Sequence, residues 1–73
     1  MAGEVARITE ISARSDTSFE DAIKIGVQRA TKTLRNVTGA WVKEQQLHIK
    51  GDQVTQYQVN LLVTFVLEDT TGG

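Results

Sequence analysis

The chain contains 73 residues with a net charge of -1, and it has one histidine, no cysteine and no proline. A chain of this length forms one domain, residues 1–73, whose small core often needs support from other subunits, because disulfides and thiolate metal sites are excluded. The charges form no basic stripe and no run approaches about 20 apolar residues, so we expect a cytoplasmic protein without nucleic-acid or membrane partners.

The first predicted element is a strand over residues 5–12. Val5, Ile8 and Ile11 alternate only partly with polar residues in this segment. A polar turn over residues 13–17 is expected to follow the strand and to lead into a helix.

The helix is predicted to begin at one of two capping pairs and to end near Arg35. Thr17 with Glu20, or Ser18 with Asp21, has the spacing at which side chains satisfy the first free amides of a helix. Apolar residues then recur every three or four positions, which is typical of one buried helix face. This stripe consists of Phe19, Ala22, Ile23, Gly26, Val27, Ala30 and Leu34.

Gly26 lies within the apolar stripe. A glycine in a helix costs roughly 1 kcal/mol relative to alanine. Either close packing of the helix on the sheet offsets this cost, or the glycine is simply tolerated.

A second strand is predicted over residues 40–49, and Gly51 with Asp52 forms a hairpin turn into the last strand. The apolar row of the second strand changes phase, because Ala40 and Val42 have the opposite parity from Leu47 and Ile49. A bulge or bend near Gln45 and Gln46 would bring both pairs to the core and would curl the hairpin.

The last strand, residues 54–67, is apolar on both faces. One face carries an alternating row consisting of Val59, Leu61, Val63, Phe65 and Leu67. Leu62 and Val66 fall on the other face, which a single helix does not cover, so they indicate another subunit or a buried ligand. The element order predicts an α+β fold with a three-stranded antiparallel sheet wrapped around one helix.

Residues for catalysis or for a metal site are sparse. His48 is the only histidine, and the acidic residues are dispersed, so one chain cannot supply an ordinary zinc or calcium site. No nucleophile motif and no phosphate-binding glycine loop is present either. We therefore expect no enzyme and no metal within one chain, with His48 at a surface or a subunit interface.

Trp41 and Gln58 are the candidate ligand-binding residues. The parity of the second strand places Trp41 opposite Ala40, on the face without a helix, where a wide aromatic often serves an interface or a stacking site. Gln58 shares its face with Asn60 and Leu62, and its amide offers both donors and acceptors. An indole and an amide together could hold the ring face and the polar edge of a flat heteroaromatic molecule.

Three stretches resemble the dodecin family, whose members are small flavin-binding proteins that assemble into dodecameric shells. These stretches are RITEIS, SFEDAIKIGVQRATKTLRNV and YQVNLLVTFVLED, and they cover most of the chain. The resemblance implies a homododecamer that binds and stores a flavin without turnover. It also implies that Gln58, which follows Tyr57, bonds the pyrimidine edge of the flavin.

The chain departs from the family pattern at the residue that stacks on the flavin. Alignment of the helix and of Val42 places Gly39 where dodecins carry a tryptophan, and Trp41 follows two residues later. This moves the indole by about 6.7 Å along the strand. Trp41 therefore forms either a shifted aromatic wall or a subunit contact, and Gly39 leaves the space of the missing indole.

A second departure concerns the charge near the ligand. Many dodecins carry an arginine between the Phe and Leu of their last strand, where this chain has Val66. Phosphorylated flavins are therefore less favoured, and riboflavin is a better candidate than FMN.

Two other functions remain open. The first is a structural shell that has lost flavin binding and holds ions or other small guests at its axes. The second is a weakly oligomeric module that binds another partner.

Overall fold

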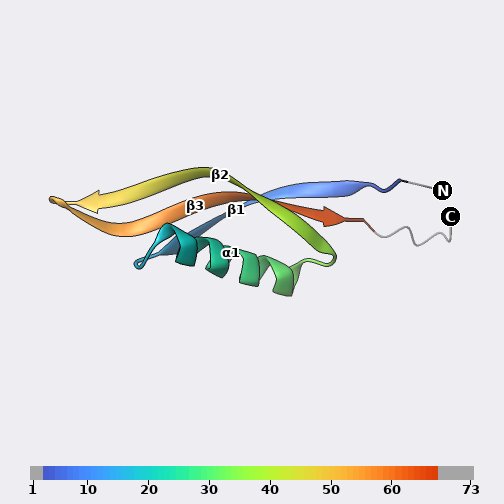
Figure 1. The fold of residues 1–73 in the computed structure, drawn as a ribbon, viewed down its shortest axis with the longest axis horizontal. Coiled ribbons are helices and arrows are strands. Elements are labelled where there is room, and N and C mark those ends of the chain that lie inside the picture. The colour runs from blue at the N-terminus through green and yellow to red at the C-terminus, as the bar shows by residue number, and fades with distance from the viewer. Residues whose placement is uncertain (1–2, 68–73) are drawn as a thin grey trace.

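The computed structural model describes residues 3–67 and has the predicted order of elements (Figure 1). The elements are β1 (Ala6–Ser15), α1 (Phe19–Thr33), β2 (Val37–Lys50) and β3 (Gln53–Val66). β3 is the central strand, and it pairs antiparallel with β1 on one side and with β2 on the other. The predicted α+β fold with a three-stranded antiparallel sheet and one helix is confirmed.

β1 continues three residues beyond the predicted end of the strand, so the polar turn expected over residues 13–17 is shorter. Ala13 pairs with Val59, and Ser15 pairs with Tyr57. Both Ala13 and Ser15 are buried, because they lie between the sheet and the helix. Packing against the helix therefore extends a strand whose local sequence is polar.

The other element boundaries shift by a few residues. The helix ends at Thr33 instead of near Arg35, and Asn36 adopts a left-handed conformation with φ of 59° that turns the chain toward β2. Asparagine tolerates this region better than most residues do. β2 consequently begins at Val37 instead of at residue 40.

The helix begins at the second of the two predicted capping pairs. The Ser18 hydroxyl accepts a hydrogen bond of 3.0 Å from the Asp21 backbone N–H. Ser15 at the end of β1 donates a hydrogen bond of 2.7 Å from its hydroxyl to the Asp21 carboxylate and accepts one from the Thr17 N–H. These bonds join the end of β1 to the first turn of α1.

The core lies between α1 and the centre of the sheet. The buried helix residues are Ala22, Gly26 and Ala30, and they face Ala13, Val59, Leu61 and Val63. A Cβ on Gly26 would lie 2.8 Å from Leu61 Cδ1 and 3.1 Å from Ala13 Cβ. Close packing is therefore the reason for this glycine, as the first of the two interpretations proposed.

The β2–β3 hairpin contains irregularities at three places, and one of them lies near the bend predicted around Gln45 and Gln46. On β2 the extra residues are Thr38 and Lys43, and on β3 the extra residue is Thr55. The bulge at Lys43 brings Leu47 to the same face as Val42. This bulge lies two residues before Gln45, since the backbone can absorb an extra residue at several points of a long hairpin. The expected burial of both apolar pairs in the core is wrong, because Val42, Leu47 and Ile49 remain exposed.

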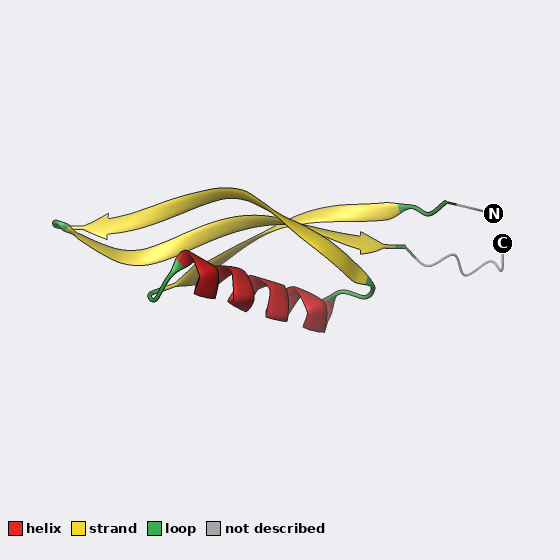
Figure 2. Ribbon diagram, viewed as in Figure 1, coloured by secondary structure: helices red, strands yellow, loops and turns green. Residues whose placement is uncertain are grey.

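The shape of the chain is elongated. Its extents are 57 × 19 × 13 Å and its radius of gyration is 15.5 Å, whereas a compact domain of this length has about 11 Å. The hairpin extends well past α1, which covers only part of one sheet face (Figure 2). Val42 and Leu47 lie on the helix side of the sheet but remain exposed, because the helix does not reach them.

Candidate functional site

The face of the sheet without a helix carries the predicted ligand-binding residues. Trp41 pairs with Leu62 across β2 and β3, and 62% of the Trp41 surface is exposed. An indole this exposed, above an apolar neighbour, can stack on a flat ligand or on another subunit. Its placement on the helix-free face agrees with the prediction from parity.

Gly39 lies on the same face, two pairs further along the hairpin. It pairs with Thr64, and a Cβ built on it would meet nothing within 4 Å. The space above Gly39 is therefore open, and a larger side chain would fit there without displacing any described residue.

Gln58 shares this face but lies far from Trp41 within one chain. Gln58 is four residues from Leu62, the partner of Trp41, which corresponds to about 13 Å along β3. One subunit alone does not bring the indole and the amide to one small ring system. A ligand that contacts both residues would have to lie between subunits.

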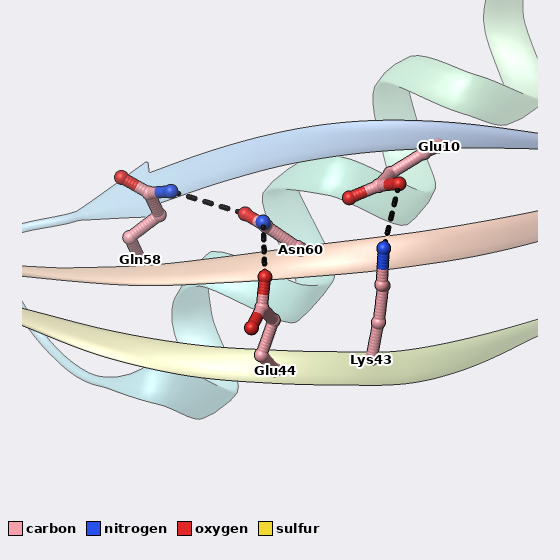
Figure 3. Close-up of polar contacts among 5 residues, drawn as sticks. All are labelled: Glu10, Lys43, Glu44, Gln58 and Asn60. Atoms are coloured by element: carbon pink, nitrogen blue, oxygen red, sulfur yellow. Dashed lines mark hydrogen bonds and ion pairs between the residues drawn. The ribbon is translucent and has the colours of Figure 1, made fainter.

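Gln58 is the centre of a polar network that crosses all three strands. Its Nε2 donates to Asn60 Oδ1 at 3.0 Å, and Asn60 Nδ2 donates to Glu44 Oε1 at 3.2 Å (Figure 3). Its Oε1 accepts a bond of 3.1 Å from Arg14 Nε and lies 2.8 Å from His48 Nε2. The network holds the Gln58 amide in one orientation.

A second polar pair lies beside this network. Lys43, the bulged residue of β2, reaches Glu10 on β1 with 3.1 Å between Nζ and Oε1 (Figure 3). Both side chains are nearly half exposed, so the pair contributes little to stability. Glu10 and Trp41 both pair with Leu62 of β3, so charge of both signs lies in the same row of the sheet as Trp41.

His48 and Arg14 are the two partners of the Gln58 oxygen that sequence reasoning missed. Without the bulge at Thr55, continuation of the register from the hairpin turn would place His48 on the face opposite to Gln58. The bulge pairs His48 with Gln56 instead, on the same face as Gln58. Arg14 was assigned to a turn, and only the longer β1 places it directly opposite Gln58.

The described residues offer neither an obvious metal site nor a membrane span. Within residues 3–67 no group of three or more His, Cys, Asp or Glu side chains lies close enough to hold an ion. In the same range, α1 is too short and too polar to cross a bilayer.

The fold and this face define a class of small α+β proteins in which one helix covers a three-stranded sheet and leaves the other face available. Residues 5–68 match the family model described as Dodecin. The chain is 40% identical to a curated dodecin from Thermus thermophilus, over 93% of this chain and 99% of that protein. The chain belongs to the dodecin family.

Solved structures agree with this assignment. The dodecin from Streptomyces coelicolor has 31% identity and a TM-score of 0.87, over 96% of this chain and 100% of that chain. A Thermus thermophilus protein has 40% identity and a TM-score of 0.85, over 93% and 100%. A calcium dodecin from Mycobacterium tuberculosis, described as having a novel calcium-binding site, has 28% identity and a TM-score of 0.76, over 90% and 94%.

Proposed function

We propose that this dodecin assembles into a homododecameric shell and stores a flavin in the cytoplasm. The observation that carries the proposal is Trp41, an indole with 62% of its surface exposed on the face without a helix, in a chain of the dodecin family. The proposed role is binding without turnover.

The two candidate residues would contribute different interactions. Trp41 would offer its ring face, since offset stacking of aromatic rings adds to the effect of buried area. Gln58 of a neighbouring subunit would offer its amide to the polar edge of the ring system, since one subunit holds the two residues too far apart. A flavin stacked on an indole has its excited state quenched and its reactivity with solvent reduced.

Riboflavin fits the composition of this site better than FMN does. Val66 contributes no charge where other dodecins carry an arginine, and its side chain is half-buried beside Ala6 of β1. On the same face, Lys43 is already paired with Glu10. A phosphate would therefore find little compensation for its charge at these positions.

The test is a titration of riboflavin with the purified assembly, followed by flavin fluorescence. We expect saturable quenching by the wild-type protein and about tenfold weaker binding by Trp41→Ala, from the loss of stacking. Ile49→Ala is the matched control, because Ile49 is an equally exposed apolar residue of β2. No quenching at tens of micromolar wild-type protein would refute the flavin proposal.

The second candidate function is a structural shell that holds ions or other small guests. Gly39 favours it, since the stacking indole is missing there, and the similar calcium dodecin is described as having a calcium-binding site. Calorimetric titration with Ca²⁺ tests this function directly. If wild-type protein leaves riboflavin fluorescent but Gly39→Trp quenches it, the missing indole explains the loss of flavin binding.

A further inference from the structure

The hydrogen bonds across the helix-free face run in one fixed direction. Arg14 can only donate, and it donates to Gln58 Oε1. Glu44 at the other end can only accept as a carboxylate, and it accepts from Asn60 Nδ2. Because both ends are fixed, the Gln58 and Asn60 amides cannot be flipped without setting donor against donor or acceptor against acceptor.

This direction determines the state of His48. Gln58 Oε1 can only accept, so the 2.8 Å contact with His48 Nε2 requires a hydrogen on that nitrogen. Arg14 and His48 then occupy both acceptor positions of the Gln58 oxygen. One amide N–H of Gln58 donates to Asn60. Among the described residues this is the bond that Nε2 makes, so its second N–H can donate to a ligand.

The position of His48 is built into the hairpin. Its side chain is half-buried, and the Thr55 hydroxyl, from the bulge of β3, donates a 3.1 Å bond to the His48 carbonyl oxygen. The same bulge places the imidazole on the face of Gln58. The backbone register therefore determines that the His48 side chain lies on the same face as Gln58.

We propose that His48 and Arg14 are positioning residues that leave Gln58 able only to donate a hydrogen bond to a ligand. The site then selects a ligand whose ring edge presents a carbonyl or another acceptor atom to Gln58. The inference rests on the proposed function, because it specifies which atoms of the flavin ring edge Gln58 recognises. A ring N–H of the ligand finds no acceptor on Gln58 while His48 is in place. Removal of His48 frees one lone pair of Gln58 Oε1, and the amide can then also accept from a ring N–H.

Two ligands separate these cases. Riboflavin carries an N–H between the two carbonyls of its pyrimidine ring, and 3-methylriboflavin carries a methyl group there instead. We expect the wild-type assembly to bind the two with nearly equal affinity by fluorescence quenching. In His48→Ala the preference for riboflavin should rise about fivefold, which is the value of one neutral hydrogen bond.

His48→Val also removes the imidazole, and valine favours strands more than alanine does. The test therefore does not depend on whether His48→Ala folds correctly. Lys50→Ala, an exposed substitution on the same strand, is the control and should leave the preference unchanged. Comparison of this affinity ratio between each variant and the wild-type protein cancels any steric effect of the methyl group that is common to all of them.

Three results would contradict the inference. If both His48 variants keep the wild-type preference, His48 does not control Gln58. If the wild-type protein already prefers riboflavin about fivefold or more, Gln58 accepts from the ring N–H despite its partners. If riboflavin does not bind to any variant, the proposed function fails, and this inference fails with it.

Discussion

At the scale of single residues, two glycines show how the same residue type serves opposite purposes. Gly26 is buried, and a Cβ on it would lie within 3.1 Å of Leu61 and Ala13. Gly39 is exposed on a strand, and a Cβ there would meet open space. The first glycine is required by packing, whereas the second leaves open space on the helix-free face.

Gly26→Ala should destabilise the protein. Overpacking of a tight core costs about 1–3 kcal/mol, and the gain in helix propensity is about 1 kcal/mol, so we expect a net loss of about 1 kcal/mol. Urea denaturation at a fixed protein concentration measures the difference. Gly39→Ala is the control, and it should leave the midpoint unchanged or raise it slightly. An equal gain in both variants would show that the helix can move away from Leu61.

At the scale of elements, the junction of β1 and α1 is held by three serine and aspartate side chains. Ser18 caps the helix, and the Asp21 carboxylate receives the Ser15 hydroxyl from the end of the strand. Asp21 also places negative charge in the first turn, where the helix dipole favours it. This junction fixes where the helix begins and the angle at which it leaves the sheet.

Ser18→Ala should cost about 1 kcal/mol of stability, because the Asp21 N–H loses its side-chain acceptor. Ser18→Asp supplies another acceptor at the same position and should retain most of the stability. Thermal unfolding followed by circular dichroism compares the two variants with the wild-type protein. If Ser18→Asp were as unstable as Ser18→Ala, the capping interaction would not be the cause.

At the scale of the whole molecule, the single chain leaves too much apolar surface uncovered. Nine large hydrophobic residues are exposed among the described residues, and several lie on the hairpin beyond the reach of α1. Leu62 and Val66, on the helix-free face, are only half-buried. An elongated chain with this surface is expected to be stable only when other copies cover it.

Leu47→Lys should weaken the proposed assembly. Leu47 is 42% exposed in the single chain, so the change should alter the stability of an isolated subunit by less than about 0.5 kcal/mol. Burial of a charge at a subunit contact costs far more. Native mass spectrometry should show smaller species in place of the proposed dodecamer, while the exposed control Gln53→Lys remains assembled.

Two results would count against this account of the whole molecule. A stable wild-type monomer at micromolar concentration would exclude the shell. Species of the wild-type protein that grow with concentration but remain smaller than the shell would favour a weakly oligomeric module.

The sequence by itself determined the features that depend on neighbours within about one helical turn or one strand. The spacing of Ala22, Gly26 and Ala30 defines the buried face of α1. The alternation of Val59, Leu61 and Val63 defines the core face of β3. These periods of 3.6 and 2 residues are properties of local backbone geometry, so they can be read without knowledge of what packs against them.

Only the tertiary structure decided where strands end and where they slip. The last residues of β1 are polar in part, and contact with the helix extends the strand through them to Ser15. The bulge at Thr55 brings His48 to Gln58, and one residue of register would have put it on the opposite face. Register depends on the sum of contacts along both strands and the helix, and this sum is not contained in any local pattern.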